Sequence, residues 1–306
     1  MGILCRVGGG YKMKKNLLVC RSGGRTSEYM YKRLLAEYSD KYNIVGIFAN
    51  TGWEHHKTLE FVNNNDIENA KLYGAKSIWV EAVVNAGRVA CTHKVVTYET
   101  ASRNREPMIE VIKKYGLPNA AYPHCTRELK EAPIHDYVKN ILGWSNKKDG
   151  DNNYNTALGI RIDEPRRLKN SVTPQNKVYP LAHWFNDAPD KLDILDWWEE
   201  REFDLGIPEH LGNYVGCFRK SERKSMKAYR DAPEQFVNTM EKDFGHIGSN
   251  KIKGVHVDEP RTMYRNYKTC DDIITMFNEV DKGWLNKDDP DYMNEGCASS
   301  CEPFAG

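Results

Sequence analysis

The sequence of 306 residues contains no long apolar stretch. No run approaches the roughly 18 consecutive apolar residues that a membrane helix needs. The first residues, MGILCRVGGGYKMKK, lack the apolar core of a signal peptide. Gly2 follows Met1, but Arg6 stands where a myristoylation signal has Ser or Thr. These absences predict a cytoplasmic protein with no membrane partner, and we expect an irregular extension ahead of Met13.

An excess of charge of either sign is also absent. The 44 Lys and Arg residues balance 43 Asp and Glu residues, for a net charge of +1. The chain therefore has no overall basic field, and any contact with nucleic acid must come from a local patch. A composition of 40% hydrophobic and 28% charged residues is typical of a globular protein. The length suits one large domain or two modest ones.

Two common phosphate-binding motifs are missing as well. The chain has neither the G-x-x-x-x-G-K-[ST] motif of the Walker loop nor the G-x-G-x-x-G motif of dinucleotide-binding folds. It does have eight cysteines. In an intracellular chain of this length they argue against a disulfide framework. Cys20 lies in an apolar run and is expected to be a small core residue.

What the sequence does contain is an alternation of short apolar runs and helix-like segments. Strands are predicted over residues 16–20, 43–50, 77–84 and 156–162, and helices over 27–38, 58–64, 106–115 and 128–142. Polar loops are predicted over 146–155 and 166–177. The alternation predicts an α/β fold with a parallel, doubly wound, Rossmann-like sheet. From about Val178 the pattern changes, so we predict an α/β domain over 13–177 and a mostly helical region with a cysteine-bearing tail over 178–306.

The segment NLLVCRSGGRTSEYMYKRL, residues 16–34, has the order strand, glycine turn, helix. This is a geometry that holds anions, because the N–H groups and the dipole of the helix N-terminus both favour negative charge. Glycines let the main chain approach a phosphate, and hydroxyl and guanidinium groups add donors. Ser27 is also expected to cap the helix. The alternative is a plain strand-to-helix turn. We name residues 22–27 the phosphate loop; its members are Ser22, Gly23, Gly24, Arg25, Thr26 and Ser27.

The phosphate loop resembles the pyrophosphate-binding loop SGGxDS of the adenine nucleotide alpha-hydrolase (PP-loop ATP pyrophosphatase) superfamily. Four later stretches resemble its phosphoadenosine phosphosulfate reductase-like branch, in the same order along the chain. They are NTGWEHHKTLEFV (50–62), CTRELKEAPIHDYV (125–138), GIRIDEPRR (159–167) and GNYVGCFRKS (212–221). The resemblance covers about residues 16 to 225. It implies a HUP-type sheet that binds an adenine nucleotide, such as ATP with Mg²⁺, at its carboxyl edge.

The resemblance also implies a set of site residues. Arg161 and Arg166 lie at and just past the end of the fourth predicted strand and would bind phosphate or sulfate, since a guanidinium group matches that geometry; the alternative is a solvated charge cluster. Glu54 would hold Mg²⁺, or is equally a carboxylate favoured at a helix start. Lys130 is equally compatible with the surface. The expected nucleotide-binding residues are the phosphate loop together with Asn50, Thr51, Gly52, Arg127, Lys130 and Gly159.

Four cysteines form a candidate metal site: Cys125, Cys217, Cys297 and Cys301. Four thiolates can bind zinc or an iron–sulfur cluster, and the resemblance favours a four-iron four-sulfur cluster. The chain lacks the Cys-Cys pair and the C-x-x-C of the related reductases, and Tyr214 stands where some relatives have Cys. Zinc and free thiols therefore stay open. So does a persulfide-carrying nucleophile at Cys297 or Cys301.

Three functions follow from these motifs. The first is an ATP pyrophosphatase that adenylylates nucleic acid for sulfur incorporation, as in DNA phosphorothioation, with a cysteine desulfurase and DNA-modification proteins as partners. The second is a reductase that makes sulfite from adenylyl sulfate or its 3′-phosphorylated form. The third is a non-catalytic nucleotide-binding protein of a phage or defence system. Thr26 replaces the Asp of the ATP-hydrolysing members, and the tail lacks the reductases' Glu-Cys-Gly-Leu-His ending. A homo-oligomer stays open.

One internal similarity stands apart from these motifs. IRIDEPRR at residues 160–167 resembles VHVDEPRT at 255–262. The flanking residues do not match, so we interpret the similarity as a coincidence and not as an internal repeat.

Overall fold

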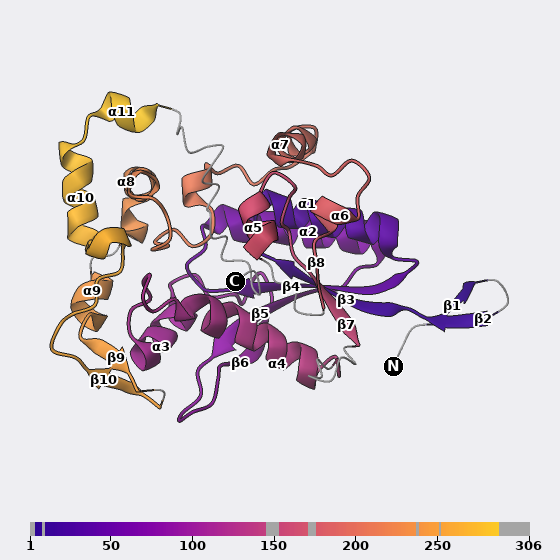
Figure 1. Cartoon of the computed structure of the whole chain (residues 1–306), viewed down its shortest axis with the longest axis horizontal. Coiled ribbons are helices and arrows are strands. Elements are labelled where there is room, and N and C mark those ends of the chain that lie inside the picture. The colour runs from indigo at the N-terminus through magenta and orange to yellow at the C-terminus, as the bar shows by residue number, and fades with distance from the viewer. Residues whose placement is uncertain are drawn as a thin grey trace.

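The sheet at the centre of the chain has six strands in the order β6-β5-β4-β3-β7-β8 (Figure 1). We describe residues 4–7, 10–144, 153–170, 176–236, 239–250 and 252–287 of a computed structural model. The strands are β3 (Lys15–Arg21), β4 (Tyr42–Asn50), β5 (Ser77–Val83), β6 (Thr92–Val96), β7 (Tyr154–Ala157) and β8 (Lys177–Val178). All neighbours pair in parallel except β5 and β6. The predicted Rossmann-like α/β fold is confirmed.

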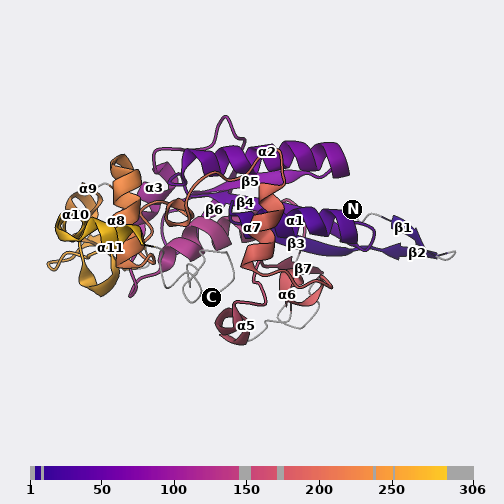
Figure 2. The ribbon, with the colours of Figure 1, turned by 90° about the horizontal axis from the view of Figure 1, so that it is seen from above.

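Helices cover both faces of this sheet, as Figures 1 and 2 show. One face carries α1 (Arg25–Tyr38), α2 (His56–Tyr73), α6 (Pro180–His183) and α7 (Lys191–Glu199). The other carries α3 (Glu106–Tyr115), a π-helix (Thr126–Glu131) and α4 (Ala132–Asn140). Because the sheet is covered on both sides, the middle of β3 is apolar, and its Leu17, Leu18 and Val19 are buried. The doubly wound arrangement is thus confirmed.

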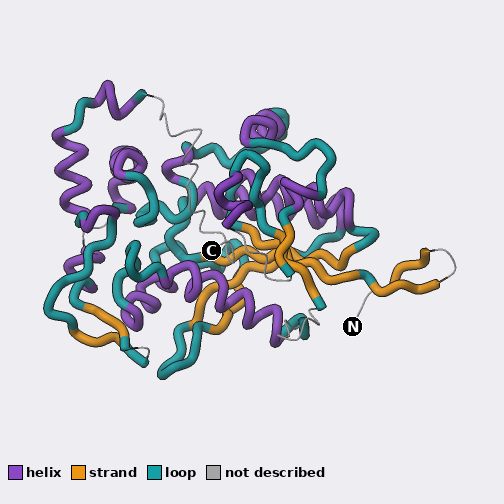
Figure 3. Tube along the Cα trace, viewed as in Figure 1, coloured by secondary structure: helices purple, strands orange, loops and turns teal. Residues whose placement is uncertain are grey.

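The C-terminal part is mainly helical, as predicted, with α8 (Glu222–Asp231), α9 (Thr239–Phe244), α10 (Cys270–Glu279) and α11 (Lys282–Asn286). It also contains a hairpin that was not predicted, formed by β9 (Ile247–Ser249) and β10 (Gly254–His256) (Figure 3). This hairpin packs against the end of α3. Gly116, at a φ of 80°, permits the contact, because a Cβ there would lie 2.1 Å from the Ile247 carbonyl oxygen.

Several boundaries differ from the sequence prediction. The expected irregular extension ahead of Met13 is instead a hairpin of β1 (Leu4–Val7) and β2 (Gly10–Met13), which projects beyond β3 (Figure 2). The fourth predicted strand ends at Ala157, five residues early. Helix α5 (Pro165–Asn170) occupies part of a predicted loop. Residues 146–152 and the tail from 288 lie outside the described part.

Short strands and edge strands account for the other differences. β6 and β8 were not predicted, since β6 carries exposed polar residues and β8 spans only Lys177 and Val178. β8 belongs to the sheet but lies across the expected domain boundary at residue 177. The division into two domains therefore stays a prediction. Within the described ranges, no helix is long and apolar enough to cross a membrane.

A buried cluster of charges joins β3 to the two helices above it. Arg21 ends β3, and its Nη2 lies 2.6 Å from Glu28 Oε2 of α1, with both side chains fully buried. Arg21 Nη1 lies 2.6 Å from Asp66 Oδ1 of α2. Trp79 of β5 donates its Nε1–H to the other Asp66 oxygen at 2.6 Å. Although burial acts to lower it, the two carboxylates raise the pKa of Arg21 above its ordinary value.

This cluster yields a stability prediction. Arg21→Ala leaves Glu28 buried without its cation, so we expect the free energy of unfolding in urea to fall by about 3–5 kcal/mol. Arg25→Ala is the matched control. It removes a cation one turn away whose partly exposed pair with Asp204 contributes no more than about 1 kcal/mol. Equal losses for the two variants would contradict this reading.

Candidate functional site

The phosphate loop makes a sharp turn between β3 and α1. Gly23 has a φ of 78°, a conformation that favours glycine. A Cβ at this position would lie 2.8 Å from Thr58 Cγ2 and 3.1 Å from the Phe48 ring. Glycine is therefore needed here both for the backbone conformation and for close packing against α2.

Ser27 does not cap the helix as predicted, because α1 begins two residues earlier and Gly24 holds the N-cap position. Ser27 Oγ instead accepts from the Ser22 amide at 3.2 Å and from Ser22 Oγ at 3.1 Å. It donates to the Gly24 carbonyl at 3.0 Å. No side chain caps the first turn of α1. Its backbone N–H groups are thus left for an anion or water.

A cavity of about 360 Å³, which we call the first cavity, opens beside this turn. It is lined by Ser22, Gly24, Arg25 and Thr26 of the phosphate loop, by Gly159, Arg161, Glu164 and Arg167, and by parts of residues 191–213. We call residues 191–213 the covering segment. β4 lies on one side of β3 and β7 on the other, so the strand order reverses here. Ligands of open α/β sheets bind at such a point.

Arg161 reaches across this cavity to the phosphate loop. Its Nη1 donates to Thr26 Oγ1 at 3.3 Å, while its Nε donates to Asp163 Oδ1 at 2.8 Å. Arg161 thus lies where the resemblance placed it. Arg167, which was not singled out, lines the same cavity, and its Nη1 contacts Glu164 Oε1 at 2.5 Å. The sequence feature that could have indicated Arg167 is its position three residues after Glu164, a spacing at which opposite charges can pair.

Arg166 takes a different position from the one that the sequence suggested. It lies on α5, is exposed, and does not line the first cavity. The turn at Asp163 and Glu164 starts a helix at Pro165, and a helix points neighbouring residues in different directions. As a result Arg167 faces the cavity and Arg166 does not.

Arg25 connects the phosphate loop to the covering segment. Its Nε and Nη2 donate to the two carboxylate oxygens of Asp204 at 2.6 and 2.5 Å. Its carbonyl accepts from Trp198 Nε1 at 3.1 Å. Burial acts to raise the pKa of Asp204, but the Arg25 contacts hold it below its ordinary value. Arg25 therefore fixes the wall of the cavity as well as lining it.

Asn50, Thr51 and Gly52 are buried at the end of β4 and do not line the first cavity. Asn50 Nδ2 donates to Glu81 Oε1 at 2.7 Å and to the Ser102 carbonyl at 2.9 Å. These side chains hold the loop that follows β6 against the sheet. Gly52 packs closely against Ser102 and against Pro107 at the start of α3.

Glu54 is likewise turned into the protein. Its oxygens accept from the Thr51 amide at 3.0 Å and from Thr51 Oγ1 at 2.8 Å. Burial raises the pKa of Glu54, and the nearby Lys130 acts against this rise. Glu54 does not line the first cavity. The assignment of Glu54 to Mg²⁺ therefore stays a prediction.

Arg127 and Lys130 both lie on the π-helix, a rare element that often marks functional sites. Lys130 is not on the surface: it is only 4% exposed, near Glu54 and Cys125. Arg127 is exposed and lines a second cavity, separate from the first. Neither residue lines the first cavity; of the predicted site residues outside the phosphate loop, Gly159 and Arg161 line it.

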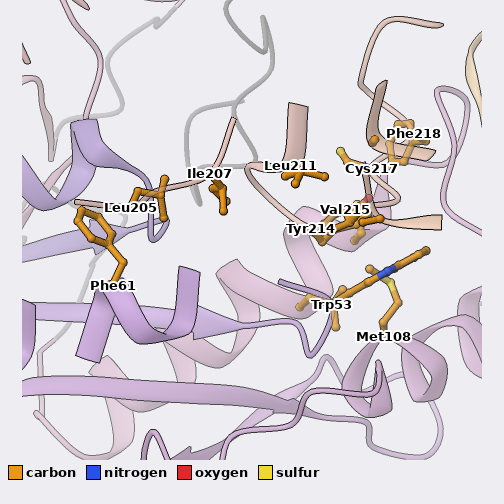
Figure 4. Packing of buried hydrophobic residues seen from close by; sticks show 14 of the residues in the cluster. Trp53, Phe61, Met108, Leu205, Ile207, Leu211, Tyr214, Val215, Cys217 and Phe218 are labelled. Carbon is orange, nitrogen blue, oxygen red and sulfur yellow. The ribbon is translucent and has the colours of Figure 1, made fainter. Parts of the chain in front are cut away.

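Cys125 and Cys217 are neighbours in the interior, although 92 residues separate them in the sequence. Burial and then the Cys217 thiol raise the pKa of Cys125, while the Tyr214 hydroxyl, which donates to its Sγ at 3.7 Å, acts against this rise. Figure 4 shows Cys217 and Tyr214 above Trp53, whose ring stacks on Tyr214 at 5.4 Å. The structure thus brings together two of the four predicted metal ligands.

The other two, Cys297 and Cys301, lie outside the described residues. Among the described residues, no group of three or more His, Cys, Asp and Glu side chains is arranged to hold a metal ion. Cys20, Cys91 and Cys270 are buried at other places in the core.

The fold and the first cavity define an α/β protein whose candidate ligand site lies at the carboxyl edge of a parallel sheet, where the strand order reverses. The chain belongs to the family of the "uncharacterized nin region protein ORF290" of Escherichia phage lambda. The two proteins are 31% identical over 299 residues, which cover 94% of this chain and 95% of the phage protein.

A weaker similarity is to the probable glucan 1,3-beta-glucosidases D of Neosartorya fischeri and Aspergillus fumigatus. These proteins are 26% identical to the chain over 196 residues, which are 58% of this chain but only 21% of either glucosidase. The chain thus matches about a fifth of their length. No protein-family model and no solved structure matches the chain.

The two glycines of the phosphate loop give a matched pair of variants. Gly23→Ala places a side chain at positive φ, which costs about 1–3 kcal/mol, and the contact with Thr58 adds to this cost. Gly24→Ala meets only Ser22 Oγ, at 3.6 Å, and should cost no more than about 1 kcal/mol. Urea unfolding compares the two variants. A larger loss for Gly24→Ala would contradict the described turn.

Proposed function

We propose that the chain is a nucleotide-dependent enzyme of the phosphoadenosine phosphosulfate reductase-like, ATP pyrophosphatase type. It would adenylylate nucleic acid so that sulfur can be incorporated. The observation that carries the proposal is the first cavity, in which the uncapped N-terminus of α1, the Thr26 hydroxyl and the Arg161 guanidinium meet at the point where the strand order reverses. Together these groups offer donors to a chain of phosphates.

The walls of the first cavity carry both charged and apolar groups, which supports a nucleotide in particular. Arg161 and Arg167 line it together with the phosphate loop, and the covering segment contributes Ile194, Leu205 and Ile207 beside Lys191 and Glu209. A polar phosphate group and an apolar aromatic base need these two kinds of surface side by side. An adenine ring would lie against the covering segment while the phosphates lie on the helix N-terminus.

The carboxylates that line the first cavity are paired with cations, so a bound Mg²⁺ would be held mainly by the phosphates of ATP. The carboxylates that line the first cavity are Glu164 and Glu209. Glu164 contacts Arg167, and Glu209 contacts Lys191 at 3.0 Å and Lys224 at 3.2 Å. Mg²⁺ commonly binds through substrate phosphates and water with one or two carboxylates. The lining residues are therefore compatible with ATP–Mg²⁺ if Glu164 or Glu209 exchanges its Arg or Lys partner for the metal ion.

In the proposed reaction, an oxygen of the nucleic acid attacks the α-phosphorus of ATP and pyrophosphate leaves. A sulfur nucleophile then displaces AMP. Negative charge builds on the phosphate oxygens in the first step. Arg161, Arg167 and the N–H groups of α1 are placed to stabilise it. The sulfur would come from a partner such as a cysteine desulfurase, as it does in DNA phosphorothioation systems.

Cys125 and Cys217 fit as half of a cluster site. Both are buried, at 2% and 1% exposure, within an apolar group of side chains that would keep water away. Arg219 and Lys130 act on the Cys125 thiol in the direction that stabilises a thiolate. A four-iron four-sulfur cluster needs two more thiolates, for which the sequence offers Cys297 and Cys301. When bound, such a cluster would supply a redox-active or structural iron–sulfur centre.

A second candidate is reduction of adenylyl sulfate or its 3′-phosphorylated form to sulfite. The specific observation in its favour is Thr26, which binds Arg161 where a metal-binding Asp would stand in ATP-hydrolysing members. The sulfate group of adenylyl sulfate is recognised by the same kinds of donors as a phosphate. Because the chain is related to a phage lambda protein, a non-catalytic role in a phage is a further candidate for the test below.

Turnover of ATP discriminates these functions. We expect the full chain to bind ATP–Mg²⁺ in calorimetry and to release pyrophosphate slowly. Arg161→Ala should weaken ATP binding at least about tenfold, since it removes a charge-assisted contact. Arg88→Ala removes an equal charge from an exposed site outside both cavities and is the control. Sulfite release from adenylyl sulfate with thioredoxin, without pyrophosphate release, would replace the proposal by the reductase. Binding of ATP without turnover would support the third function, a non-catalytic nucleotide-binding protein.

The metal content tests the cysteine assignment separately. Anaerobically purified protein should carry about four iron atoms and about four sulfides per chain. Cys125→Ser and Cys217→Ser should each lose most of this iron. Cys91→Ser replaces a buried thiol elsewhere in the core and should retain it. Zinc in place of iron would support a structural site, and protein without either metal would contradict both.

A further inference from the structure

The second cavity, of about 280 Å³, lies between the end of α3 and the β9–β10 hairpin. Its lining includes Tyr115, Tyr122 and Arg127 from one stretch of chain, and Ser249 and Arg261 from the hairpin and the segment after it. It shares no lining residue with the first cavity. The proposed reaction at the first cavity leaves this second space without a role.

Two guanidinium groups give this cavity a local positive charge. Arg127 Nε contacts Glu128 Oε1 at 2.8 Å, but the Arg127 side chain is 63% exposed. Its two Nη groups make no hydrogen bond within the described ranges. Arg261 Nη1 donates to the Tyr115 carbonyl at 2.8 Å, which fixes this guanidinium at the cavity wall. Several N–H donors are thus left for an anion.

An exposed aromatic ring lies beside these cations. Tyr122 is 50% exposed, and the Arg261 guanidinium carbon lies 3.9 Å from its ring centroid. The Tyr122 amide donates to Asn119 Oδ1 at 3.0 Å, so the backbone that carries the ring is held in place. A fixed ring next to a guanidinium is the arrangement on which nucleic-acid bases stack in sequence-tolerant binding sites.

We infer that the second cavity binds one nucleotide unit of a single-stranded nucleic acid, with its phosphate at Arg127 and Arg261 and its base on Tyr122. The volume suits one unstacked nucleotide and not a duplex groove. The near-zero net charge gives the chain no overall basic field, so binding of nucleic acid depends on a local patch of this kind. The inference rests on the proposed function, since this strand would be the acceptor.

The position in the chain agrees with that role. His124 lines the second cavity, and the next residue, Cys125, belongs to the buried cysteine pair. A nucleotide bound at the second cavity would therefore lie beside Cys125, one of the proposed ligands of the iron–sulfur cluster.

Fluorescence anisotropy with a 5′-fluorescein-labelled ten-residue oligothymidylate tests the inference on the full chain at low salt. Tyr122→Ala should weaken binding at least about fivefold, because stacking of one base is lost. Tyr122→Phe keeps the ring and should bind like the wild type. Arg127→Ala should weaken binding about tenfold and lower the salt dependence, whereas Arg88→Ala should do neither. Equal affinity of Tyr122→Ala, Arg127→Ala and Arg88→Ala, or no binding by any of them, would overturn the inference.

Two further arms identify the source of the nucleotide and separate this test from that of the first cavity. Thymidine monophosphate that displaces the labelled strand at similar concentrations would assign the site to free nucleotides, whereas a much tighter strand would assign it to nucleic acid. Arg161→Ala should keep strand binding, and Arg127→Ala should keep ATP binding. A wild-type chain that binds the strand but does not turn over ATP would refute the proposed function alone. A wild-type chain that turns over ATP but does not bind the strand would refute this inference alone.

Discussion

The buried pair of Arg21 and Glu28, extended to Asp66, is the interaction on which the site depends. Arg21 is the last residue of β3, and its partners lie on α1 and α2. A charge buried without its partner is strongly destabilising, so the three elements are held in one arrangement. The turn between β3 and α1 then has little freedom. This constraint aims the first turn of α1 at the edge of the sheet.

The first cavity is then completed by parts of the chain that lie far apart in sequence. The covering segment is fixed by the contact of Arg25 with Asp204, and Arg161 arrives from the exit of β7. Arg161 meets the phosphate loop because β7 pairs with β3 on the side opposite β4. The site is therefore a consequence of the reversal in strand order, and it combines a rigid loop with walls from two other segments.

The sequence was informative wherever local pattern decides structure. The glycine turn at Gly23 and the apolar strands β3, β4 and β5 could be predicted, since continuous apolar runs mark strands buried on both faces. The polar edge strand β6 and the two-residue β8 have no such pattern. Packing between segments that are distant in sequence could not be predicted either. It buries Glu54 and Asn50 in the protein, and it makes Arg167, and not Arg166, a lining residue of the first cavity. The sequence motifs indicated Cys125 and Cys217 as candidate metal ligands, but their proximity follows from the fold alone.

Hydrogen–deuterium exchange with and without ATP–Mg²⁺ tests the central claim most directly, because it locates the nucleotide along the chain. The account predicts slower exchange at the amides of the phosphate loop, residues 22–27, and at residues 159–164. The segment 115–127 of the second cavity should be unchanged. Protection confined to that segment, or no protection anywhere at saturating ATP, would contradict the assignment of the first cavity as the nucleotide site.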